Sequence, residues 1–214
     1  MALFMDPLDI YLMILGATLL GSAYTVWLTV KSMAMAQLTV KQTVKEDPQP
    51  EVVIGVKSLS FYYMGVGVFA LATGVWGIAT WPLPSSYNIV LMDPWALFGA
   101  AALIVGLSLY FTGSLSTVSV PLAFLGIIPI VYGVDILKYN LTTEPGLAAA
   151  LYILTGLAPL LSPFAYLTKG RVSRYIGLLI MALLVVAGII AYMIGVGATF
   201  EHTAGWVKWT PWYG

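Results

Sequence analysis

The chain has 214 residues, of which 60% are hydrophobic and only 8% are charged. A soluble globular domain carries roughly 25% charged residues, so this composition excludes that class. The formal net charge is zero, which gives no indication of nucleic-acid binding, and the absence of cysteine excludes disulfides, thiolate-bound metals and a cysteine nucleophile. We therefore expect an all-α polytopic membrane protein whose main partner is the lipid bilayer.

Six apolar segments predict six transmembrane helices, because about 20 mainly apolar residues suffice to cross a bilayer. In chain order they cover residues 8–30, 60–80, 92–113, 117–138, 146–168 and 173–198. Asp6 and Asp9 lie at the start of the first apolar stretch, where a cleavable signal would carry Lys or Arg, so we expect the first helix to remain. Residues 1–214 are expected to form a single domain, a bundle of these six helices.

The connections between the segments differ in character. The only long polar connection covers residues 31–58, where Pro48 and Pro50 mark a break. The next connection, WPLPSSYNIVL at 81–91, has no charge and two prolines, and we expect a loop at the level of the lipid headgroups. Gly113 is the expected end of the third helix. The short GSLST turn that begins there predicts that the third and fourth helices are antiparallel neighbours.

The distribution of Lys and Arg predicts the orientation, because cytoplasmic connections carry an excess of both. If six helices cross the membrane, one side holds seven of the nine: Lys31, Lys41, Lys45, Lys57, Lys169, Arg171 and Arg174. The other side holds Lys138 and Lys208. We therefore expect a multi-pass protein of the cell membrane with the 31–58 loop in the cytoplasm and both termini outside. Asn140, in Asn-Leu-Thr, then lies in an external loop and matches the N-glycosylation pattern.

Prolines interrupt the fourth and fifth helices at Pro129, Pro159 and Pro163. Each removes a backbone donor and tends to kink a helix. In a membrane the freed carbonyl must be satisfied by protein or by a water-filled cavity. Two interpretations stay open, simple kinks or kinked helices that line a path for a solute. For the second, the candidate pore-lining residues are Tyr132, Asp135, Tyr152 and Thr155.

Two acids lie near the ends of apolar segments. Asp93 stands in Asp-Pro-Trp, where an acid at the cap followed by proline at the first position is a common helix start, so we expect a capping role. Asp135 lies three residues before Lys138, a spacing that permits an interfacial ion pair. An acid on a membrane helix is also a functional candidate, and both interpretations of Asp135 stay open.

His202, the single histidine, follows Glu201 on the expected outer side. It is either an ordinary surface residue or, because histidine changes charge near neutral pH, a gate together with Glu201. One histidine without cysteine makes a haem or zinc site improbable. We expect no metal and no cofactor. The chain also lacks GxSxG, HExxH and phosphate-binding glycine loops, so we do not expect an enzyme.

Residues 199–214, which end in GWVKWTPWYG, are expected to form an aromatic external tail at the membrane interface. Trp206, Trp209 and Trp212 recur every three residues and so share one side of this segment. They either anchor the tail in the headgroup layer or pack as a lid on a neighbouring subunit or over a pore mouth.

Three stretches carry a resemblance to known channels: DPWALFGAAALIVGLSLYFTG, PLAFLGIIPIVYGVDILKYN and GLAAALYILTGLAPLLSPFAYLTKG. In length, glycine placement and order they resemble the third to fifth helices of the six-helix urea and amide channel family, which is similar to the acetate uptake family. Overall length and polarity also resemble an uncharacterised family of predicted membrane proteins from archaea and bacteria. The resemblance implies a homo-oligomer, a hexameric ring in which each protomer has its own pore.

This chain differs from those families at the positions where they would select a substrate. The urea channels have tryptophans around the glycine of the fifth helix, whereas the residues around Gly156 are Tyr152, Thr155, Pro159 and Leu160. The Asn-Pro-Ala-Pro motif of the acetate family is absent. The resemblance therefore implies a fold and not a substrate.

Two hypotheses for the function follow. The first is a passive channel or facilitator for a small uncharged or weakly polar solute, such as urea, a short amide or protonated acetate, because the helices carry Gly, Ser, Thr and Tyr but almost no full charges. The second is a non-catalytic accessory subunit of a larger respiratory or transport complex in the membrane, because the sequence has no active site of its own.

Overall fold

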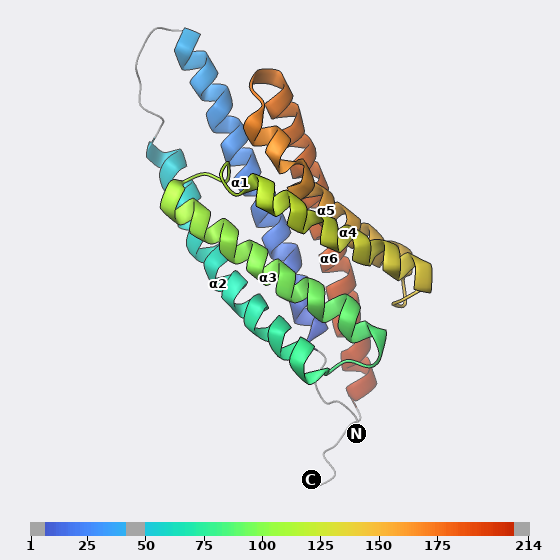
Figure 1. The fold of residues 1–214 in the computed structure, drawn as a ribbon. Helices are drawn as coiled ribbons and strands as arrows, with labels where there is room; N and C mark the ends of the chain where they lie inside the picture. The colour runs from blue at the N-terminus through green and yellow to red at the C-terminus, as the bar shows by residue number, and fades with distance from the viewer. Residues whose placement is uncertain (1–6, 42–49, 208–214) are drawn as a thin grey trace.

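The structure is a computed structural model that describes residues 7–41 and 50–207, and only the backbone at 32–41, 50–56 and 206. These residues form six α-helices and no strand: α1 (Leu8–Lys41), α2 (Pro50–Thr80), α3 (Ser86–Thr112), α4 (Ser119–Tyr139), α5 (Pro145–Leu167) and α6 (Gly170–Trp206). Each helix is long and apolar enough to cross a membrane. The predicted all-α class with six candidate membrane spans is confirmed (Figure 1).

Several helices extend beyond the apolar segments that indicated them. α1 continues to Lys41 and α2 begins at Pro50, so most of the expected 31–58 loop consists of two helical extensions around residues 42–49, which lie outside the described residues. Hydropathy locates the stretch that suits lipid. It does not locate the last backbone hydrogen bond, and a helix can continue into water through polar residues.

The same cause moves two other boundaries. α3 begins at Ser86, which shortens the expected 81–91 loop to 81–85. α6 continues to Trp206, so the first part of the expected 199–214 tail is helical. Trp209 and Trp212 lie outside the described residues, and of Trp206 only the backbone is described.

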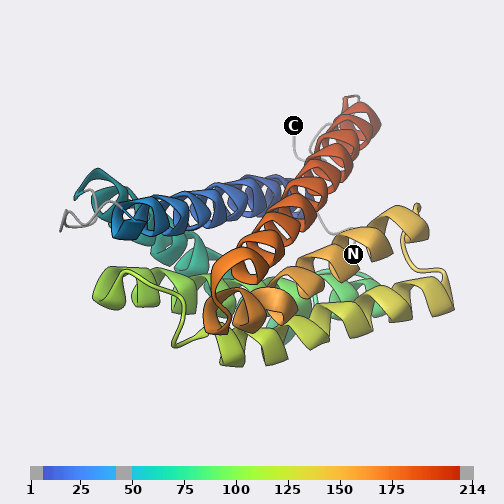
Figure 2. The same ribbon diagram turned by 90° about the horizontal axis from the view of Figure 1, so that it is seen from above.

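The helices associate mainly as three pairs, α1 with α6, α2 with α3 and α4 with α5, and α5 also packs against α6 (Figures 1 and 2). Glycines show the direction of each pair. In the second pair, for example, Gly67 faces Leu103 and Gly74 faces Ala96, so the two helices run antiparallel. The first pair joins helices from opposite ends of the chain.

Glycine, which has no side chain beyond a hydrogen atom, lets the paired helices approach closely. A Cβ atom on Gly99 would lie 2.2 Å from the backbone nitrogen of Leu71, and one on Gly156 would lie 2.4 Å from the carbonyl oxygen of Gly126. Close approach through small residues is the main source of helix association in lipid, where the hydrophobic effect between helices is absent. Close contact between paired helices therefore explains the glycines at these interfaces, although not every helical glycine, because a Cβ atom on Gly65 would meet nothing within 4 Å.

The turn between α3 and α4 begins as expected. Gly113 is the C-cap of α3 with a left-handed φ of 65°, and its N–H donates to the carbonyl of Leu109. The expected packing of α3 beside α4 is slight, however, because each has its main interface with another helix. A short turn requires only that two helix ends meet, whereas the small-residue faces decide which helices lie together along their lengths.

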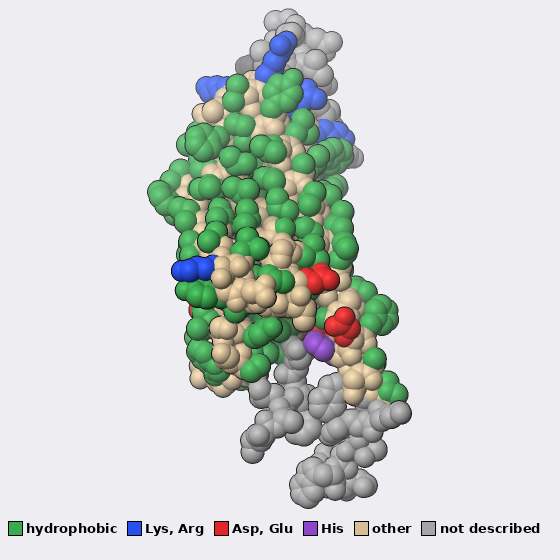
Figure 3. Space-filling model, turned by 90° about the vertical axis from the view of Figure 1, so that its right-hand side faces the viewer, with side chains coloured by type: hydrophobic (Ala, Val, Ile, Leu, Met, Phe, Trp, Pro, Cys, Tyr) green, Lys and Arg blue, Asp and Glu red, His purple; other side chains and the backbone are tan. Residues whose placement is uncertain are grey.

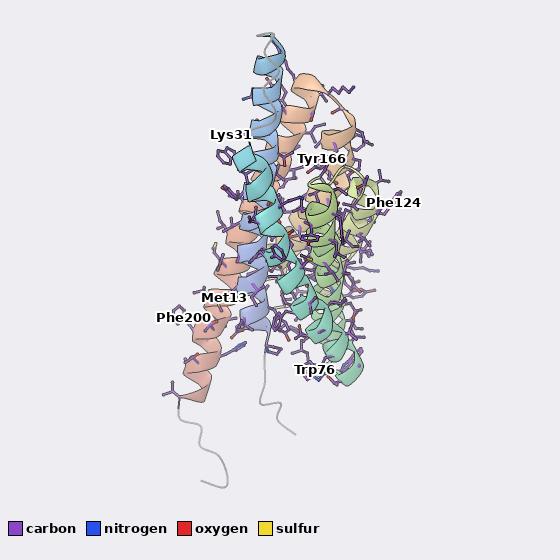
Figure 4. All side chains as sticks on the ribbon, turned by 90° about the vertical axis from the view of Figure 1, so that its left-hand side faces the viewer. Met13, Lys31, Trp76, Phe124, Tyr166 and Phe200 are labelled. Atoms are coloured by element: carbon purple, nitrogen blue, oxygen red, sulfur yellow. The ribbon has the colours of Figure 1, made fainter. Side chains whose placement is uncertain are left out.

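The two ends of the bundle differ in charge. α1 ends, α2 begins and α5 turns into α6 at the upper end of Figure 1. Figure 3 shows most of the visible Lys and Arg side chains at this end, with the acidic side chains, the histidine and a basic side chain in the lower half of the visible face. Figure 4 places Lys31 and Tyr166 in the upper half and Phe200 near the lower end. Between the ends the surface is apolar, as with Phe124, which is 68% exposed.

Candidate functional site

A cavity of about 190 Å³ lies in the upper half of the bundle, and all six helices contribute to its wall. One lining residue from each helix, in the order α1 to α6, illustrates this: Thr18, Tyr63, Phe98, Leu122, Thr155 and Ser173. The lining is mainly aliphatic and aromatic, with several hydroxyl groups and no charged side chain. We call it the upper cavity.

A second cavity, of about 140 Å³, lies in the lower half between α1, α3, α4 and α5. One wall is a stack of aromatic rings, in which the centroids of Tyr11 and Trp95 are 4.6 Å apart and those of Trp95 and Phe98 are 5.2 Å apart. The indole N–H of Trp95 donates to the hydroxyl of Thr73 at 2.9 Å, which holds the ring in place. This lower cavity also has no charged lining residue.

The two cavities meet at a shared set of residues that belongs to both walls. This junction consists of Phe98, Ala101, Leu122, Thr155 and Pro159. It draws on α3, α4 and α5. The cavities therefore follow one another along the bundle and border on the same group of mostly apolar side chains.

A stripe of hydroxyl groups runs along α1 beside the upper cavity: Thr18, Ser22, Thr25 and Thr29. Each donates to the carbonyl four residues earlier in its own helix, at 2.8 to 3.0 Å. The hydroxyl of Tyr63 joins the stripe, 2.9 Å from Thr25 Oγ1 and 3.1 Å from Ser22 Oγ. Most of the polar atoms around the upper cavity are thus occupied by the protein itself.

Prolines in the helices free backbone carbonyls four residues earlier, because proline has no N–H to donate. Pro94 frees the carbonyl of Val90, and the hydroxyl of Tyr152 donates to that carbonyl. Pro163 frees the carbonyl of Pro159, and Ser162 Oγ donates to it at 2.7 Å. Two of the four freed carbonyls are therefore satisfied by hydroxyl groups.

The other two freed carbonyls belong to residues of the cavity walls. Pro129 removes the helical donor to Leu125, which lines the lower cavity. Pro159 removes the helical donor to Thr155, at the junction. The hydroxyl oxygen of Thr155 is also enclosed by protein and has no hydrogen-bond partner. The junction therefore combines an unpartnered hydroxyl with a carbonyl that has lost its helical donor, whereas the two other enclosed side-chain oxygens without a partner in the described residues lie outside both cavities.

The sequence matches a family model described as "Protein of unknown function (DUF981)" over residues 1–205. The chain belongs to this family. The match agrees with the expected likeness to an uncharacterised family of membrane proteins. No curated protein and no solved structure matches the chain, so the resemblance to the urea and acetate channels is not confirmed.

The predicted pore-lining residues divide into two groups. Tyr152 lines the lower cavity and Thr155 lines both. Tyr132 and Asp135 are absent from both walls. Tyr132 lies instead between two helix pairs, where its hydroxyl donates to Asp93 Oδ2 at 3.0 Å.

Asp93 is not the cap of α3, and this expectation was wrong. The helix begins at Ser86 and continues through Asp93 and Pro94. A proline inside a helix removes one hydrogen bond, and here Tyr152 compensates for it, so the chain need not begin a new helix at Asp-Pro. Asp93 serves instead as the acceptor that ties α3 to α4.

The other candidates lie near the lower end of the bundle. His202 Nδ1 is 3.0 Å from Asp9 Oδ2, which links α6 to the first turn of α1, while Glu201 is exposed. The ion pair that the spacing of Asp135 and Lys138 permits does not form; the Lys138 ammonium lies 4.9 Å from the ring centroid of Tyr139. Asn140 is exposed and caps α4 in a left-handed conformation.

Sequence reasoning missed three features of the site. The hydroxyl stripe on α1 was visible as Thr or Ser at spacings of four, three and four residues, which place them on one helix face. The partnership of Asp9 with His202 and that of Asp93 with Tyr132 had no sequence signal, because each joins helices whose proximity only the fold decides.

Proposed function

We propose that this protein is a passive facilitator that lets a small uncharged solute cross the membrane through the upper and lower cavities. The observation that carries the proposal is that two cavities follow one another through the bundle, share a junction and have no charged lining residue. A path for ions requires rings of charged side chains, or ordered backbone carbonyls that replace the hydration shell of the ion. An apolar path with few open polar atoms suits an uncharged permeant.

The lining also favours solutes that have an apolar part over urea. Most hydroxyls of the upper cavity are bonded to their own helix or to each other. Urea, which is polar on all sides, would lose more hydrogen bonds to water than such a wall replaces. A short amide or a protonated carboxylic acid, with one polar end and one apolar end, fits the wall better.

We further propose that the protein lies in the cell membrane with both termini outside, and that any oligomer, a hexamer included, repeats a path that each protomer has for itself. The excess of Lys and Arg at one end of the bundle supports the orientation. The position of both cavities between helices of one chain supports the second point.

Solute uptake by reconstituted vesicles tests the function. Purified protein in liposomes should speed the swelling caused by propionamide or acetamide over that of empty liposomes. Ala101→Phe, which places a ring at the junction, should abolish the gain. Ala72→Phe adds the same ring at an exposed position of α2 and should leave uptake unchanged.

Swelling at the rate of empty liposomes for every solute, with correctly folded protein, would contradict the proposal. If foreign subunits also remained bound through purification in mild detergent, that result would favour the accessory-subunit alternative. Uptake that is unchanged in Ala101→Phe would show that the cavities are not the path.

A further inference from the structure

Thr155 differs from the other hydroxyl residues around the cavities. Thr18, Ser22, Thr25 and Thr29 each donate to a carbonyl of their own helix. Thr155 Oγ1 has no partner, although it stands on a helix where the same bond would be possible. An enclosed hydroxyl without a partner costs free energy, which is accepted most readily where a ligand supplies the missing bond.

The backbone carbonyl of Thr155 lacks its helical donor for an independent reason. Pro159 lies four residues later and has no N–H, so the carbonyl of Thr155 lacks its helical donor. Thr155 thus places a hydroxyl donor and a carbonyl acceptor at one position. That position is the junction of the two cavities.

The rest of the junction is apolar. Its other residues are Phe98, Ala101, Leu122 and Pro159. The phenyl ring of Phe98 stacks on Trp95, with centroids 5.2 Å apart, and gives the junction one aromatic wall. A molecule at the junction therefore meets one polar position on α5 and apolar surface elsewhere.

We propose that Thr155 is a binding position for a short-chain molecule with a single terminal group that both donates and accepts a hydrogen bond, a primary amide or a protonated carboxyl. The threonine hydroxyl donates to the carbonyl oxygen of the ligand, and the ligand N–H or O–H donates to the backbone carbonyl of Thr155. The alkyl end lies in the apolar part of a cavity. The role in transport rests on the proposed function, whereas the binding itself does not.

The enclosed position of the hydroxyl oxygen requires one movement. Threonine in a helix populates two χ1 rotamers, because its hydroxyl can turn toward or away from the preceding turn. Rotation exchanges the methyl and hydroxyl positions and presents the oxygen to the junction. The hydroxyl then faces the ligand on passage and returns when the ligand leaves.

Variants at Thr155 test the proposal by uptake in liposomes. Thr155→Val keeps the shape and removes the donor, and should lower the uptake of propionamide above background about three- to tenfold, the worth of one neutral hydrogen bond. Thr155→Ser keeps the donor and should retain most of the uptake. Thr199→Val is the matched control, because that hydroxyl is bonded to Gly195 in its own helix and lies outside both cavities.

Direct binding separates this inference from the proposed function. Saturation-transfer NMR of protein in lipid nanodiscs, titrated with propionamide, should give a dissociation constant that rises about three- to tenfold in Thr155→Val. Pro159→Ala supplies an N–H to the Thr155 carbonyl and should weaken binding as well. Variants that elute as the wild type in size exclusion are compared, and Thr155→Ala, which also removes the hydroxyl donor, replaces the valine variant if that variant does not fold.

The outcomes are distinct. Binding that depends on Thr155 without any uptake by the wild type would refute the facilitator and leave the binding position intact. Uptake and binding that are unchanged in Thr155→Val would overturn the inference while the facilitator stands. Binding unchanged in Pro159→Ala would overturn the role of the backbone carbonyl.

Discussion

Tyr152 and Pro94 show how one residue compensates for a bond that another removes. Pro94 cannot donate to the carbonyl of Val90, a residue that is only 1% exposed. The hydroxyl of Tyr152, from another helix, donates to that carbonyl. The pair joins α3 to α5, and it explains how a helix can continue through the Asp-Pro sequence that indicated a helix start.

Tyr152→Phe should therefore lower the free energy of unfolding by about 1 kcal/mol, because it leaves the Val90 carbonyl without a donor. In a Pro94→Ala background the same change should cost much less, since residue 94 then donates to Val90 itself. Unfolding by SDS titration of detergent-solubilised protein measures both. Tyr175→Phe, at a side chain that is 68% exposed, is the control. Equal costs with and without Pro94 would refute the compensation.

At the scale of the helices, close packing within a helix pair depends on a few glycines. A Cβ atom on Gly99 would fall within 2.7 Å of backbone atoms of α2, whereas one on Gly65 would meet nothing within 4 Å. Both residues lie on the α2–α3 pair. They therefore allow a matched comparison between a glycine at the contact of two helices and a glycine that faces no neighbouring atoms.

Gly99→Ala should destabilise the fold by about 1–3 kcal/mol, because backbone atoms cannot move aside and the two helices must separate. Gly65→Ala should be neutral or stabilising by up to about 1 kcal/mol, because alanine favours the helix more than glycine does. The free energies of unfolding of both variants measure the difference. A loss of stability that is as large for Gly65→Ala would show that the helix contact is not the cause.

At the scale of the whole molecule, the charged end of the bundle predicts its orientation. Two exposed threonines lie in turns at opposite ends, Thr117 between α3 and α4 and Thr143 between α4 and α5. Because the chain has no cysteine, each can be replaced singly to give a unique labelling site.

With the Lys- and Arg-rich end in the cytoplasm, Thr143→Cys should react with a membrane-impermeant maleimide added to intact cells, and Thr117→Cys should react only after the cells are opened. Mass spectrometry or a gel shift of the labelled chain reports the result. Labelling of Thr117→Cys in intact cells, with Thr143→Cys protected, would place both termini in the cytoplasm instead.

The sequence by itself determined the class of the protein, the number of apolar helices, the gathering of Lys and Arg at one end and the stop at Gly113. These properties depend on single segments or on single residues. Whether a stretch suits lipid follows from its own composition, and a left-handed cap follows from a glycine at one position.

Only the tertiary structure decided which helices pair, where the cavities lie and which side chains meet. α1 joins α6 across the length of the chain, Asp93 meets Tyr132, and Thr155 lacks the partner that similar hydroxyls have. Lipid provides no hydrophobic force that would sort one apolar helix from another, so the pairing depends on the shapes of facing surfaces. Those shapes arise from several helices together, and no single segment of sequence contains them.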